Sequence, residues 1–318
     1  MALERVAVFG GSGFIGRYVV KRLAAAGHPV RVACRDVEGA KFLKPMGAVG
    51  QISPMLTNVR YPDSVAKACE GMDWVVNLVG ILFESGAQQF DSVQAEGAAA
   101  IAKSAAAAGA QKLVHLSAIG ADADSESLYA QSKAAGEAAV RDAFPSATII
   151  RPSVVFGPED DFFNRFADLA RFTPALPLID GGETRMQPVY VGDVADAICK
   201  ALDDDACAGE TYELGGPRVM TMKEIMEYTL AETGKKRLLL PLPSAIAAIQ
   251  ARFLELLPNP PLTRDQLKLL AHDNVVSEGA KTLTDLGIEP TPVEAVVPRY
   301  LGRFRGLQPG AARANPDA

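Results

Sequence analysis

The chain has 318 residues, of which 48% are hydrophobic and 22% charged, and it carries a net charge of −6. This composition is ordinary for one large or two modest globular domains and excludes a disordered or collagen-like chain. The acidic balance argues against a nucleic-acid partner, because no basic excess is available to neutralise a phosphate backbone. We therefore expect a folded protein with no nucleic-acid-binding role.

The cysteines and histidines do not form a ligand cluster. Cys34, Cys69, Cys199 and Cys207 are scattered without a CxxC pair, and no histidine lies beside them in sequence. We expect no metal site, and the unpaired cysteines indicate a reducing compartment. The first residues lack a charged leader followed by an apolar core, and prolines and charges interrupt the most apolar window, Leu238–Leu257. These features predict a cytoplasmic protein without a secretion signal or a membrane-spanning segment.

The first half of the chain alternates short apolar runs with helical stretches. The runs expected to form strands are Arg5–Phe9, Val30–Ala33, Trp74–Val79, Lys112–Ser117 and Ala147–Arg151. The stretches expected to form helices are Phe14–Ala26, Ala98–Ala108 and Tyr129–Phe144. Strands separated by helices of this length predict βαβ units, and therefore an α/β fold with a doubly wound parallel sheet.

The second half is richer in proline, with short helices expected at Gly192–Leu202, Met222–Glu232, Ser244–Leu257 and Thr263–Ala271. This change of texture predicts a smaller, proline-rich C-terminal lobe built on the sheet domain. We expect residues 1–157 and 188–215 to form the sheet domain, and 158–187 and 216–305 to form the lobe that binds a substrate or partner. Residues 306–318 are rich in Gly, Ala and Pro, and we expect them to form a disordered tail.

A glycine-rich turn joins the first expected strand to the first helix. Gly10, Gly13 and Gly16 suit the tight turn, the close approach of a pyrophosphate and the packing of the helix on the strand. The helix N-terminus at Phe14 and Ile15 offers free N–H groups and a positive dipole end to phosphates. The strand–turn–helix context favours a dinucleotide-binding, Rossmann-like sheet over glycines that only shape a turn.

The end of the second strand is where such a sheet reads the cofactor's ribose. An acidic residue there accepts a hydrogen bond from a 2′-hydroxyl and repels a 2′-phosphate. Here Cys34 stands at that position and Arg35 follows, and arginine can bind a 2′-phosphate through two hydrogen bonds. We therefore favour NADP(H), so that the sheet domain is an NADP(H)-binding domain. Asp36 keeps NAD(H) as the less favoured alternative, and Arg35 could also be a solvated surface charge.

A tyrosine and a lysine four residues apart mark a second candidate site. Tyr129 and Lys133 would share one helix face. A nearby ammonium and an oxidised nicotinamide favour the phenolate, so we expect the pKa of Tyr129 to lie below its ordinary value of about 10. Such a tyrosine exchanges a proton with a hydroxyl or carbonyl while the cofactor takes or gives hydride. We take Tyr129, Lys133 and Ser117, at the end of a strand, as candidate catalytic residues.

These motifs resemble the extended and atypical short-chain dehydrogenase/reductase superfamily over residues 4–215. The matching segments, in family order, are Gly10–Gly16, Asn77–Gly80, Tyr129–Lys133, Arg151–Pro158 and Pro188–Val194. The resemblance implies further cofactor contacts: Asn58 and Val59 beside the adenine; Leu78, Val79 and Gly80 along the ribose-phosphate side; Pro152, Ser153 and Val154 near the nicotinamide.

A narrower likeness covers nearly the whole chain. Segments such as Val140–Pro145, Leu262–Gln266 and Asp285–Ile288 resemble the dehydrogenase-like accessory subunits of respiratory complex I, which have bacterial relatives. That resemblance implies a tightly held NADPH, a mainly structural role and no established turnover. It also implies complex I subunits as partners, with the chain held at the cytoplasmic face of the inner membrane by a partner rather than by insertion.

Two positions depart from the catalytic pattern of the superfamily. Ala118 stands where the second of two serines is usual, and Gln94 stands where an asparagine is usual. Groups that act only in the transition state are worth orders of magnitude in rate, so these departures favour an accessory subunit over an enzyme. An active NAD(P)-dependent epimerase, dehydratase or reductase is the alternative, and it gains if Ser117 is the catalytic serine. A cofactor-sensing regulator is a third hypothesis.

Two other features have competing interpretations. His115 lies on a buried strand, and we interpret it as a satisfied core residue rather than a base. Ile246, Ile249 and Phe253, with Leu256 and Leu257, form an apolar stripe at helical spacing. The stripe could pack within the lobe or dock onto a partner or a membrane interface.

Overall fold

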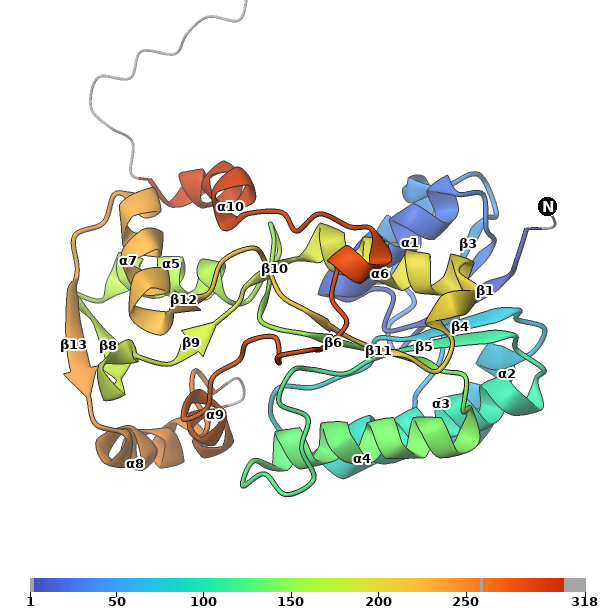
Figure 1. Cartoon of the computed structure of the whole chain (residues 1–318), viewed down its shortest axis with the longest axis horizontal. Coiled ribbons are helices and arrows are strands. Elements are labelled where there is room, and N and C mark those ends of the chain that lie inside the picture. The colour runs from blue at the N-terminus through green and yellow to red at the C-terminus, as the bar shows by residue number, and fades with distance from the viewer. Residues whose placement is uncertain (1–2, 258–259, 306–318) are drawn as a thin grey trace, which may run out of the picture.

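The computed structural model describes residues 3–257 and 260–305. Its centre is a seven-stranded parallel sheet in the order β11-β6-β5-β4-β1-β2-β3 (Figure 1). The strands are β1 (Val6–Phe9), β2 (Val30–Cys34), β3 (Ile52–Leu56), β4 (Trp74–Asn77), β5 (Lys112–Leu116), β6 (Thr148–Pro152) and β11 (Thr211–Leu214). The first six follow the strand order of dinucleotide-binding sheets, in which the order reverses at β1 and opens a crevice between β1 and β4. The predicted α/β fold class is confirmed.

Helices cover both faces of the sheet. On one face lie α1 (Phe14–Ala25) and α6 (Val191–Asp203), and on the other lie α2 (Pro62–Cys69), α3 (Glu96–Ala107) and α4 (Leu128–Ala143) (Figure 1). Alternate residues of β1 divide between the two cores: Val6 and Val8 pack with α1 and α6, and Ala7 and Phe9 pack with α2 and α3. Burial on both faces explains why the central strands are continuous apolar runs.

The C-terminal lobe has a hydrophobic core of its own. Its larger part joins α5 (Phe163–Phe172), α7 (Met222–Thr233) and α10 (Val293–Leu301). The short strands are β7 (Val155–Phe156), β8 (Ala175–Ile179), β9 (Arg185–Met186), β10 (Val189–Tyr190), β12 (Met220–Thr221) and β13 (Leu238–Leu242). Two further helices, α8 (Ser244–Leu254) and α9 (Arg264–Leu270), pack on each other below β13 (Figure 1). The expected residue boundaries between domain and lobe stay a prediction, and the expected tail 306–318 lies outside the described residues.

Several elements were not expected from the sequence. The sheet edges β3 and β11 escaped notice because β3 contains Pro54, which only an edge strand tolerates, and β11 is short and contains Glu213. The helices α2 and α10 were also missed, the latter because Pro298 lies inside it. The expected helix Ser244–Leu257 ends earlier, at Leu254. Short 3-10 turns occur at Lys41–Met46, Asp180–Gly182, Asp205–Cys207, Thr284–Leu286 and Gly302–Phe304.

Two features are absent from the described part of the chain. Across residues 3–257 and 260–305, every helix is too short or too polar to traverse a bilayer. Over the same ranges, no three His, Cys, Asp or Glu side chains gather in a way that could hold a metal ion.

Candidate functional site

The glycine-rich turn lies at the carboxyl end of β1, where the strand order reverses. Gly10 has a φ of +77°, and the N–H of Gly13 donates to the carbonyl of Gly10 at 3.0 Å. A Cβ on Gly16 would lie 2.3 Å from the Gly10 oxygen, so only glycine fits there. No side chain caps the N-terminus of α1 at Gly13 and Phe14, which leaves its first N–H groups available to an anion. The turn therefore has the shape and donors that a pyrophosphate requires.

The loop after β4 lies against this turn. A Cβ on Gly10 would lie 3.2 Å from the carbonyl carbon of Leu78. Asn77, which the sequence analysis did not single out, holds the loop: its Oδ1 accepts from the N–H of Val79 at 3.0 Å. Its Nδ2 lies 3.0 Å from Nδ1 of His115 on the neighbouring strand β5. The structure thus brings the predicted Leu78–Gly80 segment beside the glycine turn.

Lys133 is directed back toward the sheet. It is 5% exposed, and its Nζ donates to the carbonyl of Leu116 at 3.3 Å. A Cβ on Gly80 would lie 3.3 Å from both this Nζ and Oε1 of Gln94. The Nζ also lies 5.9 Å from the ring centroid of Tyr129. Gly80, Gln94, Tyr129 and Lys133 therefore converge, as the predicted site requires.

The ionisation of the Tyr129–Lys133 pair differs from the expectation. Burial lowers the pKa of the Lys133 ammonium to about 8, with the carboxylate of Glu137 opposing that shift. Burial raises the pKa of the Tyr129 phenol to about 12, whereas the sequence predicted a lowered value. The lowered value also requires an oxidised nicotinamide and stays a prediction; without a cofactor, the desolvation of Tyr129 outweighs the attraction of the Lys133 ammonium, which binds Leu116. At neutral pH Tyr129 is a phenol.

The two departures from the catalytic pattern have structural consequences. Ser117 Oγ is buried and has no hydrogen-bond partner within the described residues, and Ala118 follows it without a hydroxyl. Gln94 lies in a π-helical turn, Asp91–Ala95, that precedes α3. Its Nε2 donates to Ser132 Oγ at 2.8 Å, and its Oε1 accepts from the N–H of Ile81 at 3.4 Å. The Gln94 amide is therefore hydrogen-bonded to the helix that carries Tyr129.

The sequence predicted that His115 is a core residue with its polar atoms hydrogen-bonded, and the structure confirms this for only one of its two ring nitrogens. It is buried, and its Nδ1 is paired with Asn77, but its Nε2 has no partner within the described residues. Burial, helped by the nearby Lys133 ammonium, lowers the pKa of His115 to about 3. The residue is thus neutral at all physiological pH values and cannot serve as a proton donor in the charged form.

The ribose end of the site contains two arginines rather than one. The strand β2 ends at Cys34, and the guanidinium of Arg35 donates to Oε1 of Gln88. Arg60, which the sequence analysis missed, donates to the neighbouring carbonyl of Ala87 at 3.1 Å. The Asp36 carboxylate is used locally, because its Oδ1 accepts from the N–H of Gly39 at 2.9 Å.

The predicted adenine contacts follow β3. Asn58 Oδ1 accepts from the N–H of Arg60 at 3.1 Å, which fixes the turn that carries that guanidinium. Val59 packs against α3, and a Cβ on Gly97 would lie 3.1 Å from its Cγ2. Asn58 and Val59 therefore lie between Arg60 and the helix α3.

The predicted nicotinamide contacts follow β6. Pro152 ends the strand, and Ser153 Oγ hydrogen-bonds to the carbonyl and the side chain of Asn274 at 2.8 and 2.6 Å. Asn274 also donates to the carbonyl of Ile119 at 3.2 Å. It therefore joins the ends of β5 and β6 from a segment of the lobe, and nothing in the sequence signals that role. Val154, which follows Ser153 in the chain, packs against the core of the lobe.

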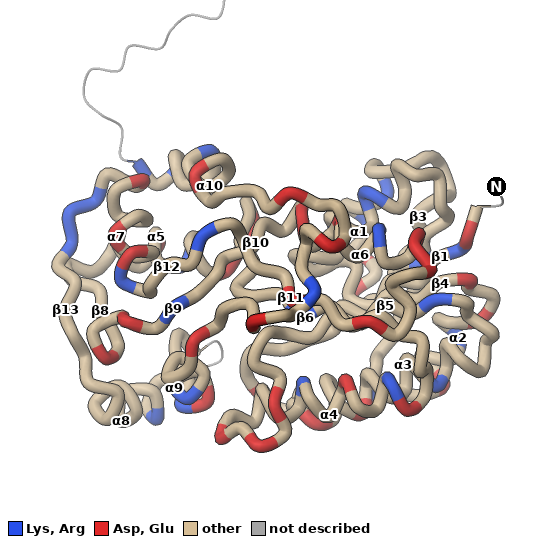
Figure 2. The backbone as a smooth tube through the Cα atoms, in the orientation of Figure 1, with Lys and Arg blue, Asp and Glu red and all other residues tan. Residues whose placement is uncertain are grey.

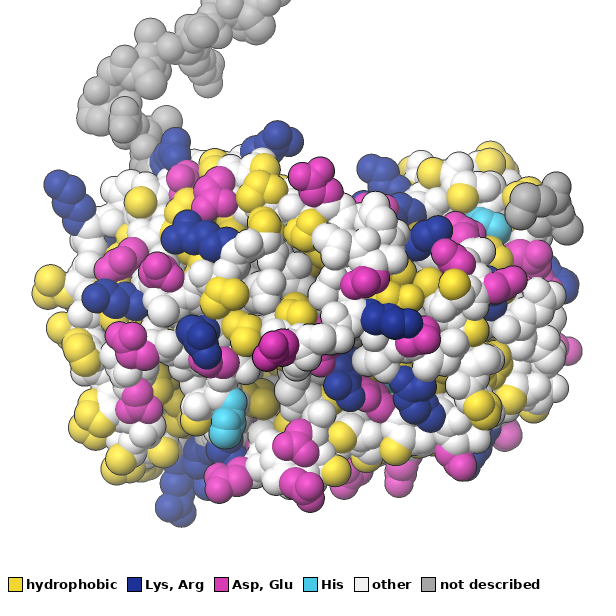
Figure 3. All heavy atoms as spheres, in the orientation of Figure 1, with side chains coloured by type: hydrophobic (Ala, Val, Ile, Leu, Met, Phe, Trp, Pro, Cys, Tyr) yellow, Lys and Arg dark blue, Asp and Glu magenta, His cyan; other side chains and the backbone are white. Residues whose placement is uncertain are grey.

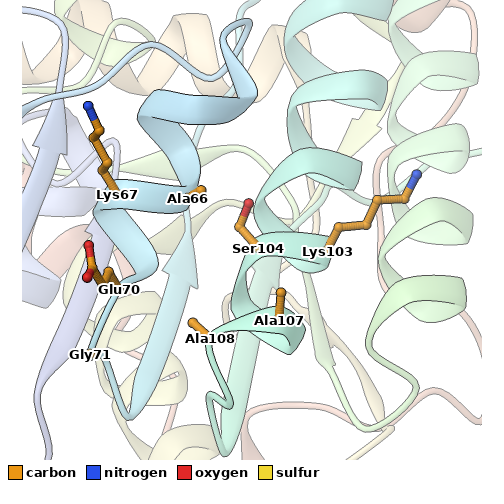
Figure 4. Close-up of a pocket in the computed structure, with 8 residues that line it drawn as sticks. All are labelled: Ala66, Lys67, Glu70, Gly71, Lys103, Ser104, Ala107 and Ala108. Atoms are coloured by element: carbon orange, nitrogen blue, oxygen red, sulfur yellow. The ribbon is translucent and has the colours of Figure 1, made fainter.

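A hollow elsewhere on the molecule takes no part in this site. It lies between the C-terminal halves of α2 and α3 (Figure 4). Its lining residues are Ala66, Lys67, Glu70, Gly71, Lys103, Ser104, Ala107 and Ala108. None of them belongs to the predicted site.

Comparisons with known proteins agree with this geometry. The model of the NAD dependent epimerase/dehydratase family matches residues 6–215. The chain is 37% identical to NADH dehydrogenase (ubiquinone) 1 alpha subcomplex subunit 9, mitochondrial, of Arabidopsis thaliana, over 94% of this chain and 77% of that protein. The Mus musculus protein of the same name is 36% identical, over 94% and 80%. A ceramide reductase of Caulobacter vibrioides is 33% identical, over 60% and 58%.

Solved structures share the fold. The UDP-glucose 4-epimerase of Thermus thermophilus, in complex with NAD, has a TM-score of 0.70 at 22% identity, covering 96% of this chain and 100% of that one. The dTDP-glucose 4,6-dehydratase DesIV of Streptomyces venezuelae, with NAD and TYD bound, has a TM-score of 0.71 at 22% identity, covering 94% and 96%. The resemblances found in the sequence are confirmed. The chain belongs to the NAD dependent epimerase/dehydratase family, in the group that includes alpha subcomplex subunit 9 of NADH dehydrogenase.

Proposed function

We propose that this protein is an accessory subunit of a respiratory NADH:quinone oxidoreductase, complex I, and that it holds NADP(H) in a structural role. One observation carries the proposal: likeness to alpha subcomplex subunit 9 extends over nearly the whole chain, including the lobe beyond the cofactor domain. A general member of the family would be expected to match over the dinucleotide-binding part, as the family model does.

The glycine cradle and the two arginines support NADP(H) as the cofactor. Gly10, Gly13 and Gly16 leave room for a pyrophosphate that side chains would fill. Arg35 binds Gln88 and Arg60 binds the adjacent Ala87, so both guanidinium groups reach the loop beside which we propose that a 2′-phosphate lies. The Asp36 carboxylate, the alternative partner for a 2′-hydroxyl, is bonded to Gly39 instead. NAD(H) is therefore the weaker candidate.

The residues around the nicotinamide end support holding rather than turnover. A bound NADP(H) would supply hydride chemistry, and this chain would have to supply the proton. Tyr129, as a phenol, could donate that proton, but Ala118 offers no hydroxyl to polarise a carbonyl, and Gln94 is hydrogen-bonded to Ser132. The alternative, an active NAD(P)-dependent epimerase, dehydratase or reductase, keeps support from the intact Tyr129–Lys133 pair, from Ser117 and from the likeness to a ceramide reductase.

The helix α8 supplies the surface for assembly. Its only buried residues are two alanines, Ala247 and Ala251, whereas Ile249 is 63% and Phe253 68% exposed. We name this exposed apolar stripe, with Ile246, Leu256 and Leu257, the α8 face. Yellow side chains gather at the lobe's end of the molecule in Figure 3. A helix that turns its small residues inward and its large ones outward is suited to docking rather than to packing within its own lobe.

A basic run precedes β13, at the opposite end of that strand from α8. Residues 235–257 include Lys235, Lys236, Arg237 and Arg252 but only one acid, Glu255, in a chain that is acidic as a whole. The run at 235–237 is the blue segment between α7 and β13 in Figure 2. Arg252 lies on α8 itself, and a positive charge beside an apolar face suits a partner at the surface of an anionic bilayer. We place the protein at the cytoplasmic face of the inner membrane, held there by complex I subunits.

Capture of the protein from native membranes tests the proposal. The tagged chain, expressed from its own locus, is purified in mild detergent; co-purifying proteins are identified by mass spectrometry, and the released nucleotide by chromatography. We expect complex I subunits and NADP(H) in the same fraction. A chain that elutes from the soluble fraction without those subunits would contradict the assembly role, whereas NAD(H) in their place would contradict only the cofactor assignment.

A further inference from the structure

A carboxylate of the C-terminal lobe caps the helix that carries Tyr129 and Lys133. Asp265, in the first turn of α9, accepts from the N–H of Leu128 at 2.8 Å and from the N–H of Tyr129 at 3.1 Å. It also accepts from the hydroxyl of Ser127, the N-cap residue of α4, at 2.8 Å. Three donors at the start of α4 therefore depend on one side chain that is distant in sequence.

The contact is specific to the first turn of α4. Ser127 Oγ in turn accepts from the N–H of Ala130 at 3.3 Å, so Asp265 and Ser127 together satisfy the N–H groups that open a helix. A negative charge at a helix N-terminus is also favourable through the helix dipole. Beside it, Lys268 Nζ donates to the carbonyl of Glu126 at 2.8 Å. One face of α9 thus holds the entry to α4.

The same helix α9 packs on α8. Leu267 lies in a small core with Ala247 and Ala251, the residues that α8 turns inward. The outward side of α8 is the α8 face. A continuous series of contacts therefore runs from the α8 face through Leu267 and Asp265 to Tyr129 (Figure 1).

We propose that Asp265 is a positioning residue of the cofactor site, through which the α8–α9 unit and NADP(H) binding influence each other. The inference rests on the proposed binding of NADP(H) at this site. If α9 moves, the first turn of α4 loses three acceptors at once, and one of the released donors is the backbone of Tyr129 itself. Because coupling between two binding events is reciprocal, cofactor that orders α4 must also stabilise α9.

The lobe offers a matched control. Asp273 accepts from the N–H and the Nε of Arg185, each at 2.8 Å, and makes no contact with α4. Its removal deletes a carboxylate of the same lobe that also accepts from a backbone N–H and from a side chain, both of them in Arg185. Effects shared by Asp265→Ala and Asp273→Ala report general loss of structure, and effects confined to the first report the capping of α4.

The experiment combines NADPH titration, followed by its fluorescence, with amide hydrogen exchange of the full chain. In Asp265→Ala we expect faster exchange at Leu128 and Tyr129 and about tenfold weaker NADPH binding; Asp273→Ala should change neither. In the wild type NADPH should slow exchange at Leu267 and Lys268 in α9, and in Asp265→Ala it should not. Should Asp265→Ala fail to fold, Asp265→Asn keeps one acceptor and should show the same changes at smaller size.

Two outcomes separate the failures. If the wild type binds no NADPH, the proposed cofactor is wrong, and the exchange at Leu128 and Tyr129 still reports whether Asp265 caps α4. If the wild type binds NADPH and Asp265→Ala binds it equally well despite faster exchange, Asp265 is a structural cap only. That second result would overturn the positioning role.

Discussion

The sheet domain and the C-terminal lobe differ in which residue types they bury and which they expose. In the sheet domain the central strands β1 and β4 are buried along their whole length, and the end of the sheet where we expect the cofactor is built from glycines and backbone groups. In the lobe the helix α8 does the opposite, because its buried residues are alanines and its exposed ones include isoleucine and phenylalanine. One end is shaped to receive a small ligand, and the other to be covered by something large. An account of the function has to explain both surfaces.

The largest effect is expected at the glycine turn. A Cβ on Gly16 would overlap the Gly10 oxygen at 2.3 Å, so Gly16→Val should displace the start of α1. NADPH binding should weaken more than about 100-fold, and the free energy of unfolding should fall by ~3 kcal/mol. Titration calorimetry and urea unfolding measure the two quantities.

Gly302→Ala is the matched control for that substitution. A Cβ at this position meets nothing within 4 Å, and the backbone φ of −53° is open to any residue. The control should leave NADPH binding and stability unchanged. Unweakened binding in Gly16→Val would show that the pyrophosphate lies elsewhere.

The second prediction concerns the lobe: charged residues introduced into the α8 face should abolish its docking. Ile249→Asp with Phe253→Lys should move the protein from the membrane fraction to the soluble fraction, because a docked apolar surface does not accept two charges. Cofactor content and melting temperature should stay at wild-type values, since both side chains are exposed. Fractionation followed by immunoblotting measures the release.

The matched control charges two exposed apolar residues outside the α8 face, Val49→Asp with Val219→Lys. This variant should stay with the membrane. If instead Ile249→Asp with Phe253→Lys unfolds, the stripe belongs to the core, and the assignment of the docking surface is wrong.

A smaller effect, on the preference between NADPH and NADH, is expected from a substitution at Arg35. Arg35→Asp places a repulsive charge where we propose a 2′-phosphate, and it should reverse the preference from NADPH to NADH, with NADPH binding weakened about 10- to 100-fold. Lys223→Asp, an exposed charge reversal in the lobe, should leave both affinities alone. Equal calorimetric affinities of the wild-type protein for the two cofactors would refute the NADP(H) assignment.

The last effect concerns His115, and its size depends on how far the pH is lowered. Its pKa is near 3 in the folded protein and near 6.5 in the unfolded chain, so below pH 6.5 the unfolded state takes up a proton that the folded state refuses. The wild type should therefore lose stability as pH falls from 6.5 toward 3, by about 1.4 kcal/mol per pH unit from this group. His115→Gln should lack that part of the slope in urea unfolding at pH 6 and pH 4. Identical slopes in the two proteins would mean that His115 is protonated in the fold.

Most of the sheet domain could be predicted because its rules are local. Glycines that follow a strand, and apolar runs separated by helices, identify β1, α1 and the central strands without knowledge of the rest of the chain. The ionisation of Tyr129 could not be predicted, since it depends on how deeply the ring is buried and on the carbonyl of Leu116 that Lys133 binds. Asp265 and Asn274 were invisible for a related reason: their partners lie more than a hundred residues away.

The exposed stripe was identified but not interpreted from the sequence. Helical spacing of Ile246, Ile249 and Phe253 indicates one face, but not whether that face points inward. The three-dimensional structure decides this, because Ala247 and Ala251 fill the inward side and pack on Leu267. Periodicity thus finds a face, and only packing tells which way it points.

The central claim, a cofactor that is held rather than used, is tested most directly by two substitutions at the native locus. Gly16→Val removes the cradle, and Tyr129→Phe removes only the hydroxyl that acid–base chemistry needs. We predict that the amount of assembled complex I, measured on native gels, falls in Gly16→Val and stays at the wild-type level in Tyr129→Phe. An equal fall in both variants would contradict the structural role and identify the protein as an enzyme whose turnover the membrane complex requires.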